Sequence, residues 1–92
     1  MDNQDIKNRI VRKMLRNRVV GDHKKQIDTV VGWAVPSHAE GQAKTLIDEM
    51  VSGSEPVEQY GGGARENIRL TSVEDAVEYL KDNGGDVPFG FD

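Results

Sequence analysis

A capped helix followed by a glycine-rich hairpin is the feature that most constrains the fold of this chain. Ser37-His-Ala-Glu40 reads as a capping box, in which the Ser37 hydroxyl accepts from an amide three residues on and the Glu40 carboxylate reaches back. The helix is predicted over residues 37–51. Two short segments, 57–60 and 65–70, flank Gly61-Gly62-Gly63, where glycine takes positive φ without steric cost. The pattern therefore predicts helix 37–51 followed by hairpin 57–70.

Two helices are predicted before this unit. The first runs from Asp5 to about Arg16 or Arg18, with an apolar face made by Ile6, Ile10, Val11 and Met14 and with Leu15 at its edge. The second begins at Asp22 as N-cap and runs to Trp33 or Ala34, with Ile27, Val30, Val31 and Ala34 facing the core. Val35-Pro36 ends it, because the residue before a proline avoids the α region. A tight corner at 35–37 then separates the second and third helices.

The segments around the hairpin complete one predicted domain of residues 1–92. Ile68 and Leu70 are the expected core side of the hairpin, and Val19-Val20 could add a short strand to it. Thr71-Ser-Val-Glu74 is a second capping box, and it opens a fourth helix with its apolar face at Val73, Ala76, Val77 and Leu80. Gly84-Gly85 ends that helix. The remaining residues, about 86–92, either dock on the core or form a loose tail.

Composition restricts the possible functions. The chain has 92 residues, 36% of them hydrophobic, which suits one α+β domain with a modest core. Its lack of cysteine fits a reducing compartment, and no segment resembles a membrane span or a signal peptide, so a cytoplasmic protein is expected. His23 and His38 lack a metal-ligand spacing, and no nucleophile–base pair or phosphate loop is evident. We therefore expect no cofactor, no metal site and no enzymatic activity.

Charge is unevenly distributed along the chain. The net charge is −4, yet eight of the 12 basic residues precede position 26 and face only three acids there, so that segment carries +5 and the rest −9. The basic residues concerned are Lys7, Arg9, Arg12, Lys13, Arg16, Arg18, Lys24 and Lys25. Such asymmetry marks either a surface that faces nucleic acid or a solvated basic helix paired with acidic neighbours in the fold.

The element order resembles the winged helix-turn-helix superfamily of DNA-binding domains. The resemblance is carried by residues 25–51, which span the second helix, the corner and the third helix, and by the glycine-tipped hairpin after them. It implies a small winged helix: a three-helix helix-turn-helix core, a two- or three-stranded β-hairpin wing and a C-terminal helix. In that family the helix after the corner enters the major groove, and the wing touches the neighbouring backbone or minor groove.

Carried over to this chain, the resemblance implies double-stranded DNA as a partner and a transcriptional regulator as the function. The implied DNA-binding residues are His38, Gln42, Lys44, Thr45, Arg65, Arg69, Lys24 and Lys25. Gln and Lys read purine edges in the major groove, whereas cations near a helix start suit phosphates. Helix 72–82 is a possible homodimer contact, with Tyr79 and Leu80 as the residues concerned.

Two interpretations stay open at this point. Glu40, Asp48 and Glu49 put acids on or beside the proposed reading helix, so the alternative is a winged-helix protein–protein interaction module that binds no DNA. Trp33, the single tryptophan, either fills the core at a helix end or serves as a stacking or interface residue.

Overall fold

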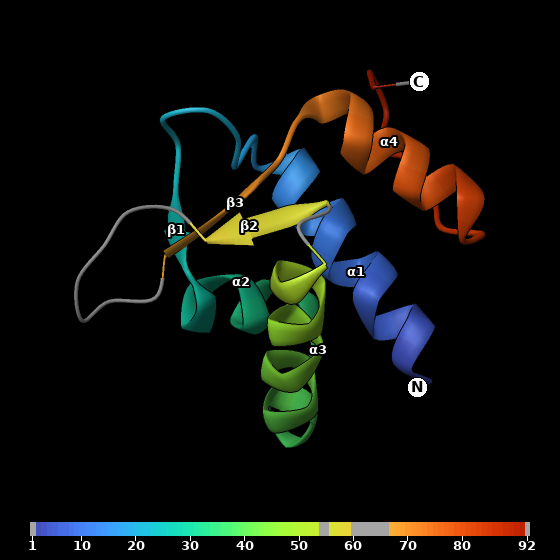
Figure 1. Ribbon diagram of the computed structural model, residues 1–92. Helices are drawn as coiled ribbons and strands as arrows, with labels where there is room; N and C mark the ends of the chain where they lie inside the picture. Colours follow the sequence, from blue (N-terminus) through green and yellow to red (C-terminus); the bar gives the residue numbers. More distant parts are fainter. Residues whose placement is uncertain (1, 54–55, 60–66, 92) are drawn as a thin grey trace.

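The fold combines four α-helices with a small antiparallel sheet in the part of the chain that the structure describes. The computed structural model describes residues 2–53, 56–59 and 67–91 (Figure 1). The three described strands pair in the order β1-β3-β2. The elements in chain order are α1 (Asn3–Arg16), β1 (Lys25–Gln26), α2 (Ile27–Ala34), the 3₁₀ turn η1 (Ser37–Ala39), α3 (Glu40–Ser52), β2 (Val57–Gln59), β3 (Asn67–Leu70) and α4 (Val73–Asp82).

Helix α1 is the centre of the packing and contacts α2, α3, α4 and β3. It starts at Asn3, two residues before the predicted start, because the Asp2 carboxylate accepts from the Asp5 amide at 2.8 Å and caps the first turn. Its five predicted core residues are all buried. The helix ends at Arg16, and Arg18 then takes the left-handed conformation with φ 55°.

The predicted start of the second helix at Asp22 is wrong: α2 starts at Ile27. Lys25 and Gln26 instead extend along β3, opposite Ile68 and Asn67. The reason is tertiary, since the open backbone edge of β3 provides hydrogen-bond partners that a local helix signal cannot reveal. The chain reaches this edge through Gly21, whose φ of +65° suits glycine. The Val19-Val20 strand is reduced to one parallel bridge between Val20 and Leu70.

The connection between α2 and α3 is longer than the predicted corner at 35–37. Ser37–Ala39 form a 3₁₀ turn, in which the Ala39 amide donates to the Pro36 carbonyl at 3.0 Å, and α3 begins only at Glu40. The predicted capping box at Ser37 is therefore wrong, because Ala39 holds the N-cap position and makes no side-chain capping bond. The core side of this segment consists of Ala39, Ala43, Leu46, Ile47 and Met50, which are buried, and of Val51, which is partly buried.

Strands β2 and β3 form the hairpin, with Val57 opposite Leu70 and Glu58 opposite Arg69. Ile68 and Leu70 face the core as predicted. The glycine turn, together with Tyr60 and Arg65, lies outside the described residues. Helix α4 is capped one residue later than predicted: the Ser72 hydroxyl accepts from the Asp75 amide at 2.9 Å.

The chain after α4 returns to the body of the protein. Pro88 is buried, Val87 and Phe91 pack against the core cluster, and the Arg18 guanidinium lies 4.8 Å from the centre of the Phe91 ring. Phe89 is fully exposed. Among the described helices, none has the length and apolarity needed to cross a bilayer. The whole arrangement is compatible with a winged helix.

Candidate nucleic-acid interface

The amino-terminal half of α3 and the turn before it present an exposed polar surface. His38, Gly41, Gln42, Lys44 and Thr45 are all exposed, and the Thr45 hydroxyl donates back to the Gly41 carbonyl at 3.2 Å. In Figure 1 this end of α3 extends beyond α2. In a helix-turn-helix unit the amino-terminal residues of the second helix contact the base edges. The start of α3 is therefore the exposed polar surface at which such contacts would be sought.

An ion pair connects this surface to the start of α2. The Lys44 ammonium lies 2.8 Å from the Asp28 carboxylate, and both side chains are well exposed, at 48% and 77%. Such surface pairs contribute about 0–1 kcal/mol, so a phosphate can replace Asp28 at small cost. Asp28 is in the first turn of α2, directly after β1, which contains Lys25 and follows Lys24. The structure thus brings three of the predicted cations to the α2 amino terminus.

The side of α3 that faces α1 is already occupied. The Gln42 amide donates to the Asn3 side chain, and the Lys7 ammonium lies 3.7 Å from the Glu49 carboxylate. Gln42 is therefore turned toward the start of α1 rather than straight outward. Lys7 offsets one of the three acids on α3. Asp48 lies on the opposite side, where it lines a small hollow with Ile27 and Gln59.

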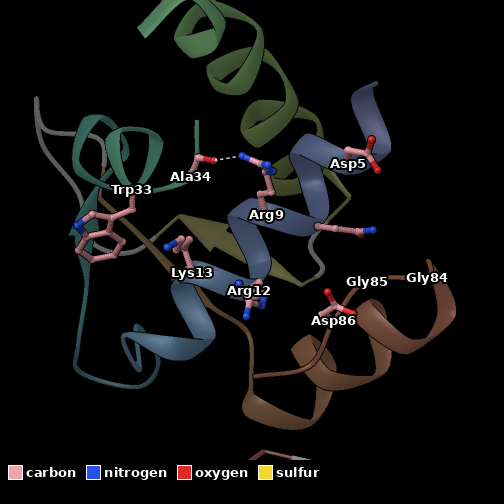
Figure 2. Close-up of a pocket in the computed structure, with 10 residues that line it drawn as sticks. Asp5, Arg9, Arg12, Lys13, Trp33, Ala34, Gly84, Gly85 and Asp86 are labelled. Carbon is pink, nitrogen blue, oxygen red and sulfur yellow. Dashed lines mark hydrogen bonds between the residues drawn. The ribbon is translucent and has the colours of Figure 1, made fainter. Parts of the chain in front are cut away.

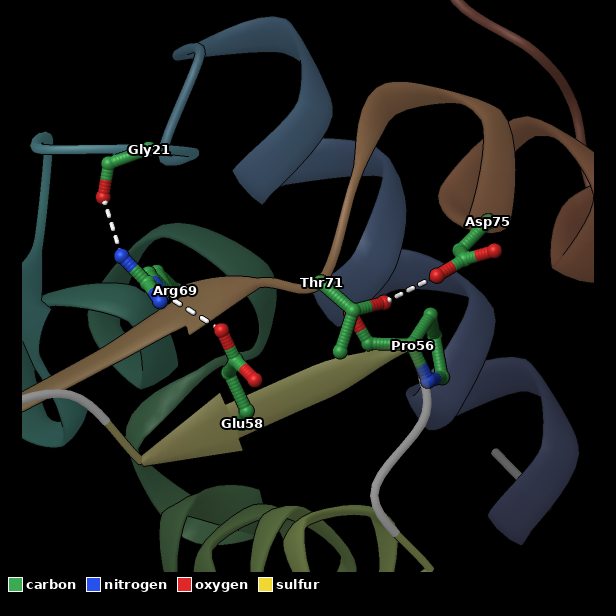
Figure 3. Close-up of polar contacts among 6 residues, drawn as sticks. All are labelled: Gly21, Pro56, Glu58, Arg69, Thr71 and Asp75. Carbon is green, nitrogen blue, oxygen red and sulfur yellow. Dashed lines mark hydrogen bonds and ion pairs between the residues drawn. The ribbon is translucent and has the colours of Figure 1, made fainter.

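Arg69 has a structural position that the resemblance did not imply. Its Nε donates to Glu58 Oε1 at 2.6 Å across the hairpin, and its Nη1 donates to the Gly21 carbonyl at 2.8 Å (Figure 3). The guanidinium therefore ties β2 and β3 to the turn that leads into β1. The cross-strand register, which places Arg69 opposite Glu58, decides this pairing.

We expect Arg69→Ala to act on stability more than on DNA. Loss of the charge-assisted bonds to Glu58 and Gly21 should lower the free energy of unfolding, measured by urea denaturation, by about 1–2 kcal/mol. The loss is modest because the side chains of Arg69 and Glu58 are both partly exposed. Glu58→Gln keeps an acceptor and should cost less than half as much. A large loss of duplex affinity by folded Arg69→Ala, without a stability change, would instead assign Arg69 to the interface.

The basic stripe of α1 lies on another side of the molecule. Arg9, Arg12, Lys13 and Arg16 recur at intervals of three and four residues and so share one helix face. Asn3 and Lys7, which contact α3, lie on a different face of α1. The basic first helix and the α3 surface therefore do not form one continuous positive face.

The remaining predicted residues divide as follows. Arg65 lies outside the described residues. Of the two residues named for a dimer contact, Leu80 is buried in its own core, and the Tyr79 hydroxyl accepts from Gln4 at 3.1 Å. Both side chains make contacts within the domain, so neither residue supports the predicted dimer contact. His23 and His38 are exposed, and no group of three metal-binding side chains occurs among the residues that can be described.

The candidate surface consists of the exposed start of α3, the α2 amino terminus and the end of β1. Comparison of the chain with protein-family models, with curated proteins and with solved structures gave no match.

Proposed function

We propose that this chain is a winged-helix protein that binds double-stranded DNA and regulates transcription, with the amino-terminal half of α3 in the major groove. The observation that carries the proposal is the exposed polar start of α3 beside Lys24, Lys25 and Lys44 at the α2 amino terminus. DNA recognition needs groups that read base edges and groups that bind phosphates on one face of a protein. The polar start of α3 would provide the former, and the lysines at the α2 amino terminus the latter.

The net charge of −4 does not argue against this face, because binding depends on local charge. Glu40 is in the first turn of α3 and stays within the proposed face. The other two acids of α3 lie away from its start: Glu49 is beside Lys7, and Asp48 is seven residues beyond Gly41, which is about 10 Å along a helix that rises 1.5 Å per residue. A helix that inserts its first two turns keeps these carboxylates near the groove mouth. The cations at the α2 amino terminus then position the domain on the phosphates.

The test is the salt dependence of binding to random-sequence duplex DNA, followed by fluorescence anisotropy. Lys24→Gln/Lys25→Gln should weaken binding to every sequence and reduce the slope of log affinity against log salt by about 2, since each lysine that contacts a phosphate contributes about 1. Lys81→Gln, on the exposed side of α4, is the control and should leave the slope unchanged. Absence of binding by the parent protein at low salt would refute the proposal.

A second function, protein–protein interaction without DNA, is favoured by one observation. The single cation of α3, Lys44, pairs with Asp28 and has Glu40 and Asp48 one turn away on either side, so this helix carries more acids than cations. A basic partner would fit such a surface better than a phosphate backbone. The α3 charge variants argued in the Discussion separate the two functions.

A further inference from the structure

A second site lies apart from the α3 surface, in a cleft of about 570 Å³ between α1, the end of α2 and the chain that follows α4. Figure 2 shows Arg9, Arg12 and Lys13 projecting from α1 into this region, with Trp33 on α2 at one side. The volume falls within the range of about 300–1,000 Å³ that is usual for small-molecule sites.

The cations of the cleft are not equivalent. Arg9 donates to the Ala34 carbonyl at 3.4 Å, so the end of α2 accounts for its position. Arg12 and Lys13 form no ion pair with any described residue. The Arg12 Nε is buried and has no hydrogen-bond partner among the residues described, which is costly for a charged group. The Arg12 guanidinium also lines the cleft, where an anion would offset its positive charge.

Trp33 gives the cleft an aromatic wall. Its ring is only partly buried against the core, and Lys13 reaches toward it in Figure 2. The two acids of the lining, Asp5 and Asp86, lie on the side of the cleft away from Trp33. The charges that line the cleft are therefore unevenly placed, and the Trp33 ring is on the side away from the two acids.

The edge opposite α2 is held in a fixed conformation. The Gly85 amide donates to the Leu80 carbonyl at 2.8 Å, and Asn8 Nδ2 donates to the Asn83 carbonyl at 3.0 Å. Gly84 has φ +71°, and a Cβ on Gly85 would lie 2.8 Å from Leu80 Cδ2. Backbone and α1 thus meet closely at this edge, so the cleft exists before any ligand binds.

We propose that this cleft binds a nucleotide unit, with its base stacked on Trp33 and its phosphate bound by Arg12 and Lys13. Arginine presents a planar fork that matches phosphate oxygens, and indole offers a face on which any base can stack. A bare anion would make no stacking contact with Trp33. An uncharged aromatic ligand would not pair with the positive charges of Arg12 and Lys13. The site does not depend on the function proposed for α3.

The test uses the fluorescence of Trp33, the single tryptophan of the chain. Adenosine 5′-monophosphate should quench it on titration, and adenosine should bind at least about tenfold more weakly because it lacks the charge-assisted bonds. Arg12→Gln/Lys13→Gln should remove this difference. Arg16→Gln/Lys81→Gln, which takes the same charge from exposed positions outside the cleft, should preserve it.

Equilibrium dialysis provides a readout that does not need the indole. Trp33→Leu keeps an apolar side chain and should weaken nucleotide binding about tenfold through lost stacking, with the fold checked by thermal melting. A single-stranded oligonucleotide that binds more tightly per site, with strong salt dependence, identifies a nucleic-acid strand as the source. Equal affinities of the oligonucleotide, per site, and of adenosine 5′-monophosphate identify a free nucleotide as the ligand. No quenching by the nucleotide, or equal quenching by nucleotide and adenosine that persists in Arg12→Gln/Lys13→Gln, overturns the proposal.

Discussion

Leu70→Ala should destabilise the domain by about 2–5 kcal/mol, which is the usual cost of truncating a fully buried leucine. Leu70 is 0% exposed and stands where three parts of the fold meet. Its side chain belongs to the core, its strand partner is Val57, and its amide donates to the Val19 carbonyl at 2.7 Å.

The effect is large against total stability, which for a small domain is about 5–15 kcal/mol. At about 4–8 °C per kcal/mol for a domain of this size, differential scanning calorimetry should show the melting temperature falling by at least about 8 °C. Leu70→Met conserves volume and should cost less than about 1.5 kcal/mol. A Leu70→Ala protein that melts within a few degrees of the parent would contradict the packing described for this residue.

Sequence reasoning was most successful for the apolar faces of the helices. Helix period alone identified the buried residues of α1 and α2, because residues that recur every three or four positions lie on one face of a helix. It misplaced the start of α2 because Lys25 and Gln26 pair with β3, a partner more than 40 residues away. It also misplaced both caps, since Ser37 enters a 3₁₀ turn and Ser72 takes the position expected for Thr71.

The functional surfaces were harder to predict than the core. His38, Lys44 and Thr45 are exposed, but the partners of Gln42 and Arg69 depend on how α1 and the hairpin dock. The cleft around Trp33 was not predicted, because its wall comes from α2, its cations from α1 and its far edge from the chain after α4. The available signal was the unusual recurrence of Arg9, Arg12, Lys13 and Arg16 on one helix face.

Thr45→Glu should abolish DNA binding by a folded protein. Thr45 is exposed in the middle of the surface proposed to enter the groove, and its one described hydrogen bond is to its own helix at Gly41. A carboxylate there faces phosphates at close range, and like charges across an interface cost several kcal/mol, so duplex affinity should fall at least about a hundredfold. Exposed helix positions tolerate glutamate, so the melting temperature should change little.

Ser52→Glu is the matched control for this variant. Ser52 is exposed at the carboxyl end of the same helix, seven residues and therefore about two turns further on, so it shares the face of Thr45 at a distance of about 10 Å. If the start of α3 enters the groove, Ser52→Glu should retain most of the affinity that Thr45→Glu loses. Equal losses would mean that only the overall charge matters. Unchanged duplex binding by both variants would show that α3 is not part of the interface. A parent protein that is folded but binds no duplex would favour the interaction module. A basic protein partner of that module should tolerate either added carboxylate.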